Sequence, residues 1–138
     1  MKRVLFLCTG NSCRSQMAEA LVNHDLGEGW AAFSAGTHPA GYVHPLALQA
    51  LAEAGIEHGG RSKAVDALRG QEIDLVVTVC DDAAEECPLW LGKGKRAHIG
   101  FSDPAKADGT PEEKLAVFRA TRDEMREKVE GYLRGLEE

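Results

Sequence analysis

The sequence lacks a long apolar run, an internal repeat and an excess of positive charge, and each absence excludes a class of protein. No segment of its 138 residues approaches the ~20 consecutive apolar residues of a membrane-spanning helix. The apolar run at 4–8, which follows Met1-Lys2-Arg3, is also shorter than the roughly 7–15 residues of a signal peptide. A formal charge of −6 with both signs mixed argues against nucleic acid or an anionic membrane as the main partner. We therefore expect a cytoplasmic protein that forms one domain over 1–138.

The chain also contains no Cys-x-x-Cys pair, although it has four cysteines. In a reducing compartment these are not expected to form a structural disulfide framework. Zinc ligands have characteristic spacings. Cys8 and Cys13 enclose four residues, the loose end of the usual interval, and Cys80 and Cys87 enclose six, which lies outside it. We therefore interpret the cysteines as reactive thiols or buried apolar side chains, and we expect neither a metal nor another cofactor.

Strand and helix patterns alternate along the chain, which predicts a three-layer α/β fold with a parallel sheet and helices on both of its faces. The expected strands lie over 4–7, 30–35, 73–79 and 97–101. The expected helices run from about 15 to 26, from Pro45 to a C-cap at Gly55, and from an N-cap at Thr110 to the C-terminal end. In such sheets the chemistry lies beyond the carboxyl ends of the strands.

The last predicted helix begins with a recognisable signal. Thr110 and Glu113 form the pattern of a capping box, and Pro111 suits the first helical position. The second helix is expected to point Leu48 and Leu51 toward the core. The residues of the last helix that we expect on its inward face are Leu115, Phe118, Met125, Val129, Tyr132 and Leu136.

The segment Cys-Thr-Gly-Asn-Ser-Cys-Arg-Ser at 8–15 lies where the first buried strand turns into the first helix. Backbone N–H groups of such a loop converge on an anion, and the helix N-terminus adds positive potential. Gly10 and Asn11 tolerate the positive φ that a tight cradle needs. Arg14 offers a planar fork of donors to a tetrahedral anion, and the same field favours a thiolate at Cys8. Cys8 is therefore a candidate nucleophile in an oxyanion site; the alternative is a strand-end cysteine beside a surface arginine.

The other residues of this loop are expected to bind the oxyanion through their backbone N–H groups. The side chain of Cys13 has no separate signal, and we interpret it as a small packed apolar group. Together with Arg14, the expected oxyanion-binding residues are Thr9, Gly10, Asn11, Ser12, Cys13 and Ser15.

A second cysteine pair follows the third predicted strand. Cys80 ends that strand as Cys8 ends the first, so the two sulfurs face one crevice if the strands are neighbours, ~4.8 Å apart. A disulfide needs Cα atoms within ~4.4–6.8 Å, which this arrangement can meet. Cys87 would lie ~10 Å from Cys80 along the axis if the acidic stretch between them is helical, so those two can bond only after unwinding. The alternative is that Cys80 is a core residue and Cys87 incidental.

Ser-Asp-Pro at 102–104 follows the fourth predicted strand, again at the carboxyl edge. A carboxyl group there can protonate an oxygen that leaves the substrate, which is general acid catalysis. Taken alone, an Asp-Pro turn explains the same residues. Combined with the loop at 8–15, a general acid is the better interpretation of Asp103.

Five segments together carry a family resemblance: Cys-Thr-Gly-Asn-Ser-Cys-Arg-Ser-Gln-Met-Ala-Glu at 8–19, Ser-Ala-Gly-Thr at 34–37, Asp-Leu-Val-Val-Thr-Val-Cys at 74–80, Cys87-Pro88 and Asp103-Pro104. With them the chain resembles the low-molecular-weight tyrosine phosphatase fold and, within it, the thioredoxin-coupled arsenate reductases. The resemblance covers nearly the whole chain. It implies a monomer whose four-stranded sheet has the order 2-1-3-4, which makes the first and third strands neighbours.

The resemblance also distinguishes two kinds of enzyme. Phosphatases of this fold keep the counterparts of Cys8, Arg14 and Asp103 but usually lack the later cysteine pair. They also tend to have a tyrosine where this chain has Ala105. The presence of the pair therefore favours a reductase.

One position departs from the reductase pattern. Members of that family can bind potassium near the anion loop through counterparts of Asn11, Glu19, Ser34 and an aspartate, and Lys63 occupies the aspartate position here. A lysine ammonium group can replace the cation, so we expect no potassium requirement. The alternative is that Lys63 is a solvated surface lysine.

The residues and the resemblance together predict reduction of arsenate to arsenite by a thiol–disulfide cascade. Cys8 attacks arsenate while the loop and Arg14 hold its oxygens and Asp103 protonates the departing one. Cys80 then attacks Cys8 and arsenite leaves. Cys87 moves the disulfide to Cys80–Cys87, where reduced thioredoxin exchanges with it. Two resolving cysteines in one chain favour thioredoxin over glutaredoxin.

The sequence also leaves other functions open. A phosphatase acting on phosphotyrosine or small aryl phosphates would use the same anion site, because phosphate and arsenate are nearly isosteric, and side activity of this kind is expected of the reductase too. It would have no use for the second cysteine pair. A redox-sensing binding module would use the cysteines but leave Arg14 and Asp103 without a role.

Overall fold

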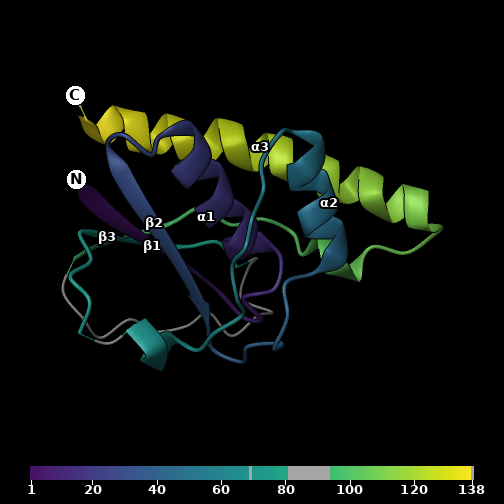
Figure 1. Ribbon diagram of the computed structural model, residues 1–138, viewed down its shortest axis with the longest axis horizontal. Coiled ribbons are helices and arrows are strands. Elements are labelled where there is room, and N and C mark those ends of the chain that lie inside the picture. Colours follow the sequence, from purple (N-terminus) through teal and green to yellow (C-terminus); the bar gives the residue numbers. More distant parts are fainter. Residues whose placement is uncertain (69, 81–93, 138) are drawn as a thin grey trace.

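A four-stranded parallel sheet forms the centre of the protein, and a computed structural model describes residues 1–68, 70–80 and 94–137 (Figure 1). The alternation of strands and helices confirms the α/β fold class. The described elements, in which η marks a 3-10 helix, are β1 (Lys2–Cys8), α1 (Arg14–Asp25), β2 (Trp30–Gly36), α2 (Pro45–Glu53), η1 (Val65–Leu68), β3 (Leu75–Thr78), β4 (Lys95–His98), η2 (Pro104–Lys106) and α3 (Pro111–Glu137).

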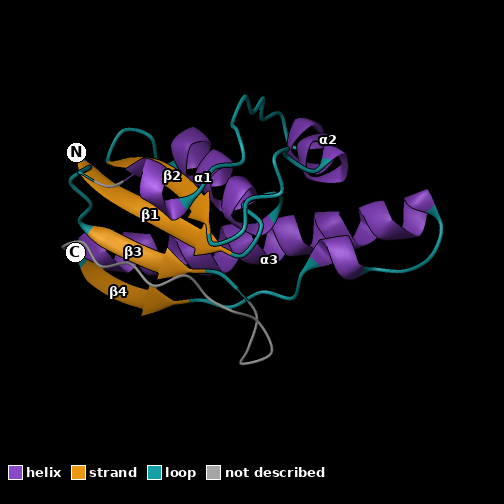
Figure 2. Ribbon diagram, turned by 90° about the horizontal axis from the view of Figure 1, so that it is seen from below, coloured by secondary structure: helices purple, strands orange, loops and turns teal. Residues whose placement is uncertain are grey.

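The strands lie in the order β2-β1-β3-β4 and are all parallel, as the family resemblance implied. β1 pairs on both sides, with Val4 opposite Leu75 of β3 and Cys8 opposite Gly36 of β2. Its residues 4–8 are buried on both faces, which is why they form a continuous apolar run rather than an alternating one. The carboxyl ends of the strands meet at one edge of the sheet (Figure 2), so the residues that follow them can form one site.

Alternate side chains of the strands enter two separate cores. Val4 and Phe6 of β1 pack against α1, α2 and α3, whereas Leu5 and Leu7 face the other side, which η1 covers through Leu68. Figure 1 shows this division, with the α-helices above the sheet and η1 below it. Helices therefore lie on both faces, as predicted, and the α-helices of the described residues share one of them.

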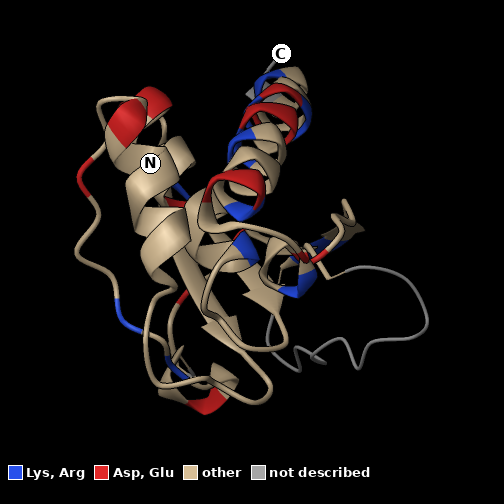
Figure 3. Ribbon diagram, turned by 90° about the vertical axis from the view of Figure 1, so that its right-hand side faces the viewer, with Lys and Arg blue, Asp and Glu red and all other residues tan. Residues whose placement is uncertain are grey.

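The helix ends follow the local signals in the sequence. At the start of α3, Thr110 Oγ1 accepts a hydrogen bond from the Glu113 backbone at 3.2 Å, and Glu113 Oε1 accepts one from the Thr110 backbone at 3.3 Å, which completes the capping box. Pro45 begins α2, and Gly55 follows its end with a φ of 80°. None of the described helices is long and apolar enough to cross a membrane. Acidic and basic residues alternate along α3 (Figure 3).

The predicted position of the fourth strand was wrong. β4 covers Lys95–His98 instead of 97–101. It lies at the edge of the sheet, where Lys95 and Arg96 are exposed, so its first half carries no apolar pattern. Phe101 lies beyond the strand and is buried in the core. Because aromatic residues are typical of strands, it extended the strand pattern in the sequence beyond the true end of β4.

The inward faces of two helices were also assigned partly wrong. Tyr132 and Leu136 of α3 are 38% exposed, and Leu133 between them is fully buried. The buried stripe advances by four residues along this part of α3, so Leu133 rather than Tyr132 meets the core. On α2, Leu51 is buried as expected but Leu48 is only half-buried.

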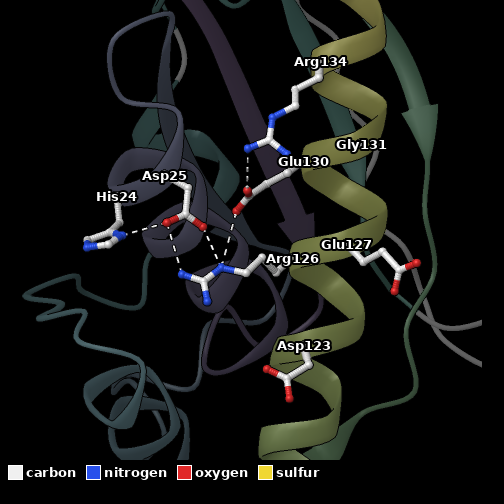
Figure 4. A pocket seen from close by; sticks show the side chains of 8 residues that line it. All are labelled: His24, Asp25, Asp123, Arg126, Glu127, Glu130, Gly131 and Arg134. Carbon is white, nitrogen blue, oxygen red and sulfur yellow. Dashed lines mark hydrogen bonds and ion pairs between the residues drawn. The ribbon is translucent and has the colours of Figure 1, made fainter.

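A cluster of charged side chains joins the end of α1 to α3 (Figure 4). Arg126 Nε donates to Asp25 Oδ2 at 2.7 Å, and Arg134 Nη2 lies 3.5 Å from Glu130 Oε1. Glu130 is 3% exposed, and its Oε2 lies 3.9 Å from Arg126 Nε. Burial, together with the nearby Asp25 carboxylate, raises the pKa of Glu130 to about 8. Glu130 therefore holds its proton to a higher pH than an ordinary glutamate does.

Glu130 makes the stability of the fold depend on pH. Unfolded, it ionises at its ordinary pKa, whereas the folded protein keeps it protonated up to about pH 8, so its titration lowers the free energy of unfolding between about pH 5 and pH 8. Glu130→Gln removes the titration and keeps a side chain of nearly the same size and shape. When the pH rises from 6 to 9, the free energy of unfolding of the variant should increase by about 1–2 kcal/mol relative to that of wild type. Urea unfolding at both pH values measures this, and parallel changes in the two proteins would contradict it.

Candidate active site

The segment between β1 and α1 forms a tight loop at the carboxyl edge of the sheet. Cys8 ends β1 and is 2% exposed, and Arg14 begins α1. Asn11 has a φ of 47°, the left-handed conformation that its residue type tolerates. A Cβ atom on Gly36 of β2 would lie 2.5 Å from the Thr9 carbonyl oxygen and 2.9 Å from the Asn11 nitrogen. The glycine therefore lets β2 approach the loop closely.

The carbonyl groups of residues 9–13 all accept hydrogen bonds from outside the loop. Because the peptide bonds are trans, each N–H points away from the carbonyl group that precedes it, so the N–H groups of residues 10–14 point away from the groups that donate to those carbonyls. With the N-terminus of α1, this is the geometry of an anion nest. Oxyanion binding by residues 9–15 stays a prediction. The donors to the five carbonyl groups, at 2.8 to 3.2 Å, are the backbone N–H groups of His38, Ala40, His44 and Met17 and the side-chain amide of Gln16.

The sulfur of Cys8 contacts the hydroxyl group of Ser15. The two atoms are 2.9 Å apart, and Ser15 Oγ also accepts a hydrogen bond from Asn11 Nδ2 at 2.7 Å. When Cys8 is ionised, only the Ser15 hydroxyl group can donate, so this contact stabilises the thiolate. We expected Ser15 to contribute only its backbone to the site, and its buried side chain adds this second contact.

Arg14 and Asp103 come together although they are far apart in the sequence. The Arg14 side chain is only 3% exposed; its Nη1 donates to the Phe101 carbonyl oxygen at 3.2 Å, and its Nη2 lies 3.7 Å from Asp103 Oδ2. Asp103 precedes η2, where its Oδ1 accepts from the Ala105 backbone at 3.0 Å. The alternative of a surface arginine is therefore wrong, and the Asp-Pro turn also brings a carboxyl group to the loop.

Cys13 has a polar contact that the sequence did not reveal. It is 5% exposed, and its sulfur donates to Asp103 Oδ1 at 3.3 Å. Burial, the nearby Asp103 carboxylate and Cys8 strongly raise the pKa of the Cys13 thiol. Cys13 therefore remains a protonated thiol at neutral pH and is a poor nucleophile. Its spacing from Cys8 offered no signal of this contact, because Asp103 lies in a distant part of the sequence.

Cys80 lies beside the end of the first strand. Its side chain is fully buried, and its sulfur is 3.8 Å from the carbonyl oxygen of Leu7, the residue before Cys8. The backbone of Val79 also donates to Leu7 at 2.8 Å, so the pairing of β1 and β3 continues up to Cys80. The inference that the first and third strands are neighbours is confirmed, and Cys80 lies two residues beyond the end of β3. Cys87 and the acidic stretch before it lie outside the described residues.

A buried network of hydrogen bonds connects the loop between β1 and α1 to the chain around residues 58–61. Gln16 Nε2 donates to Asn11 Oδ1 at 3.0 Å and to the Arg61 carbonyl oxygen at 2.8 Å. Gln16 Oε1 lies 2.7 Å from His58 Nε2. Burial lowers the pKa of His58, and Lys63 lowers it further, so a neutral imidazole donates to Gln16. These contacts hold Asn11 in its left-handed conformation. The sequence assigned no partner to His58, because Gln16 and His58 meet only in the fold.

Lys63 belongs to the same network. Its Nζ lies 4.0 Å from Glu19 Oε1, and its backbone donates to Asn11 Oδ1 at 2.9 Å. Ser34 Oγ donates to Glu19 Oε1 at 3.1 Å. The side chain of Lys63 is 25% exposed, so it is not a fully solvated lysine. Burial raises the pKa of Glu19, and Lys63 and Ser34 oppose that rise. Within the described ranges, no group of three His, Cys, Asp or Glu residues is arranged to hold a metal ion.

Comparison with known proteins identifies the family. Residues 3–138 match the family described as low molecular weight phosphotyrosine protein phosphatase. The chain belongs to this family. The match covers the anion loop, Cys80 and Asp103, so the family resemblance drawn from the sequence is confirmed.

The relatives within this phosphatase family include arsenate reductases. One from Bacillus licheniformis is 47% identical over 132 residues, which cover 95% of this chain and 94% of the relative. The solved structure of one from Archaeoglobus fulgidus is 31% identical, with a TM-score of 0.79 over 94% of this chain and 97% of that one. A thioredoxin-dependent arsenate reductase from Corynebacterium glutamicum is 28% identical, with a TM-score of 0.64 over 95% of this chain and 61% of that one.

Proposed function

We propose that the protein is an arsenate reductase that acts in the cytoplasm and is recycled by thioredoxin. The observation that carries the proposal is the position of Cys80, whose sulfur lies 3.8 Å from the carbonyl oxygen of the residue before Cys8. Phosphate-ester hydrolysis needs one nucleophilic thiol, whereas reduction needs a second thiol within reach of the first. The arsenate reductases among the relatives support this function, and the Corynebacterium glutamicum protein supports thioredoxin as the electron donor.

In the first step, the Cys8 thiolate attacks arsenic. The N–H groups of residues 10–14 and the Arg14 guanidinium group hold the oxygens that remain, and these donors are already oriented before substrate arrives. Asp103 supplies a proton to the departing hydroxyl group, which leaves as water. One As–O bond breaks and one S–As bond forms, so arsenic stays pentavalent and bound to Cys8.

In the second step, the Cys80 thiolate attacks the sulfur of Cys8. The S–As electron pair leaves with arsenic, which becomes trivalent arsenite, and a Cys8–Cys80 disulfide forms. The two electrons come from the two thiolates. Because Cys80 is fully buried, thioredoxin has no access to this disulfide in the described conformation. Cys87 therefore attacks Cys80, frees Cys8 and carries the disulfide to Cys80–Cys87, where the thioredoxin dithiol reduces it.

Hydrolysis of aryl phosphates is the second candidate function. The family description favours it, and Cys8, Arg14 and Asp103 suit a phosphate ester as well as arsenate. In that reaction water, rather than Cys80, would attack the Cys8 adduct. We expect it as a side activity of the reductase.

NADPH consumption in the presence of arsenate, thioredoxin and thioredoxin reductase tests the proposal, with hydrolysis of an aryl phosphate measured beside it. Wild type should consume NADPH only when arsenate is present. Cys87→Ser should lose this activity and retain aryl phosphate hydrolysis, since hydrolysis uses no resolving thiol. Rapid hydrolysis by wild type without arsenate-dependent NADPH consumption would make the protein a phosphatase instead.

We further propose that the Lys63 ammonium group takes the place of a cation beneath the anion loop. Wild type should have the same melting temperature and the same kcat/KM in sodium and potassium buffers. Lys63→Met should lose about 1–2 kcal/mol of stability, because the buried Glu19 carboxyl group loses its counter-charge. Lys128→Met, which removes an exposed lysine from α3, is the matched control and should change stability by less than about 0.5 kcal/mol. Stimulation of wild type specifically by potassium would overturn this proposal.

A further inference from the structure

The carboxyl group of Asp103 has two oxygens in different surroundings. Oδ1 accepts two hydrogen bonds, from the Cys13 thiol at 3.3 Å and from the Ala105 backbone at 3.0 Å. Oδ2 lies 3.7 Å from Arg14 Nη2. The donors on Oδ1 occupy the positions where a proton on that oxygen would point, so the proton of a neutral Asp103 belongs on Oδ2.

The Cys13 thiol is suited to be a permanent donor. Its side chain is buried, and burial beside the Asp103 carboxylate raises its pKa, so the sulfur keeps its proton at neutral pH. The hydrogen bond from the Ala105 backbone holds Oδ1 on the side of the carboxyl group that faces η2. Cys13, which immediately precedes α1, fixes it from the side of the anion loop. The two contacts together orient the plane of the carboxyl group.

We propose that Cys13 is a positioning residue, whose thiol holds Asp103 Oδ1 so that Oδ2 delivers the proton to the departing oxygen of the substrate. This inference rests on the role of Asp103 in the proposed function. A positioning role differs from a packing role in two ways. It requires the S–H group of Cys13 as a hydrogen-bond donor, and it affects catalysis only through Asp103. It also gives Cys13 no part as a nucleophile or resolving thiol.

A double-mutant cycle tests the inference through the rate of arsenite release in a single turnover, without thioredoxin. Cys13→Ala should be slower than wild type by about tenfold, a fraction of the 10²–10⁴-fold that a general acid contributes. Cys13→Ser retains a donor and should recover most of the rate. In an Asp103→Ala background, Cys13→Ala should have no further effect, because nothing remains to be positioned. An equal loss in both backgrounds, or no loss in wild type, would overturn the inference.

Infrared spectroscopy of the S–H stretch supplies a readout that is independent of activity. The band of Cys13 is the one that disappears in Cys13→Ser, and it should move to higher frequency in Asp103→Ala, where the thiol loses its acceptor. An unmoved band would mean that the thiol does not donate to Asp103, and would also overturn the inference. If wild type releases no arsenite, the proposed function fails. In that case, the same double-mutant cycle measured on the rate of aryl phosphate hydrolysis, together with the infrared band, tests the role of Cys13 independently of the reductase function.

Discussion

Arg14→Lys should lower kcat/KM for arsenate by about 10³-fold and impair aryl phosphate hydrolysis to a similar extent. The guanidinium group is almost fully buried, donates to the Phe101 carbonyl oxygen and lies beside Asp103, so its plane is fixed before substrate binds. A lysine keeps the charge but offers one nitrogen instead of a planar fork, and loses the paired hydrogen bonds that stabilise the transition state.

Arg119→Lys is the matched control for this substitution. Arg119 lies on α3, its side chain is 45% exposed, and it pairs with Glu53 away from the anion loop. Its replacement by lysine should leave both activities within about twofold of wild type. Steady-state kinetics of the two variants, compared with their melting temperatures, separates a catalytic loss from a loss of folding. Near-normal kcat/KM in Arg14→Lys would mean that the loop N–H groups alone bind the oxyanion.

Cys80→Ser should abolish arsenite release while aryl phosphate hydrolysis continues. A serine hydroxyl group cannot attack the Cys8 sulfur to form a disulfide, so the arsenic adduct on Cys8 has no route to reduction. We expect the rate of arsenite release to fall by more than about 10³-fold. Hydrolysis uses water for its second step and does not need this side chain.

Cys80→Ala controls for the polarity of the new side chain. Cys80 is fully buried, and a serine there costs about 1–3 kcal/mol if its hydroxyl group finds no partner. The alanine variant avoids that cost and should show the same separation of activities. If either folded variant still produced arsenite repeatedly, Cys80 would not be the resolving thiol, and the alternative reading of it as a core residue would stand.

Local sequence signals predicted the parts of the site that are built by neighbouring residues. The loop at 8–15 combines a strand end, small residues and a helix start within one short segment, and each of these has its own signature. The same holds for the Thr110 capping box. The placement of Cys80 followed from topology, because parallel strands end at one edge of the sheet and the family resemblance supplied their order.

Side-chain contacts between segments that are distant in the chain could not be predicted from the sequence. The Cys13 thiol meets Asp103, and Gln16 meets His58, only after the segment around Asp103 and the chain around residue 58 have folded against the start of α1. Neither contact follows a periodic pattern, and one sequence offers no co-variation from which to infer it. The position of β4 was misjudged for a related reason: an edge strand with exposed basic residues resembles a loop.

Trapping the first disulfide tests the central claim most directly. Cys87→Ser, fully reduced and mixed with one equivalent of arsenate in the absence of thioredoxin, should release one arsenite per protein. Alkylation followed by peptide mapping should then find Cys8 joined to Cys80, with Cys13 still free. Arsenite release with both Cys8 and Cys80 still open to alkylation, or no arsenite release by this variant, would contradict the account.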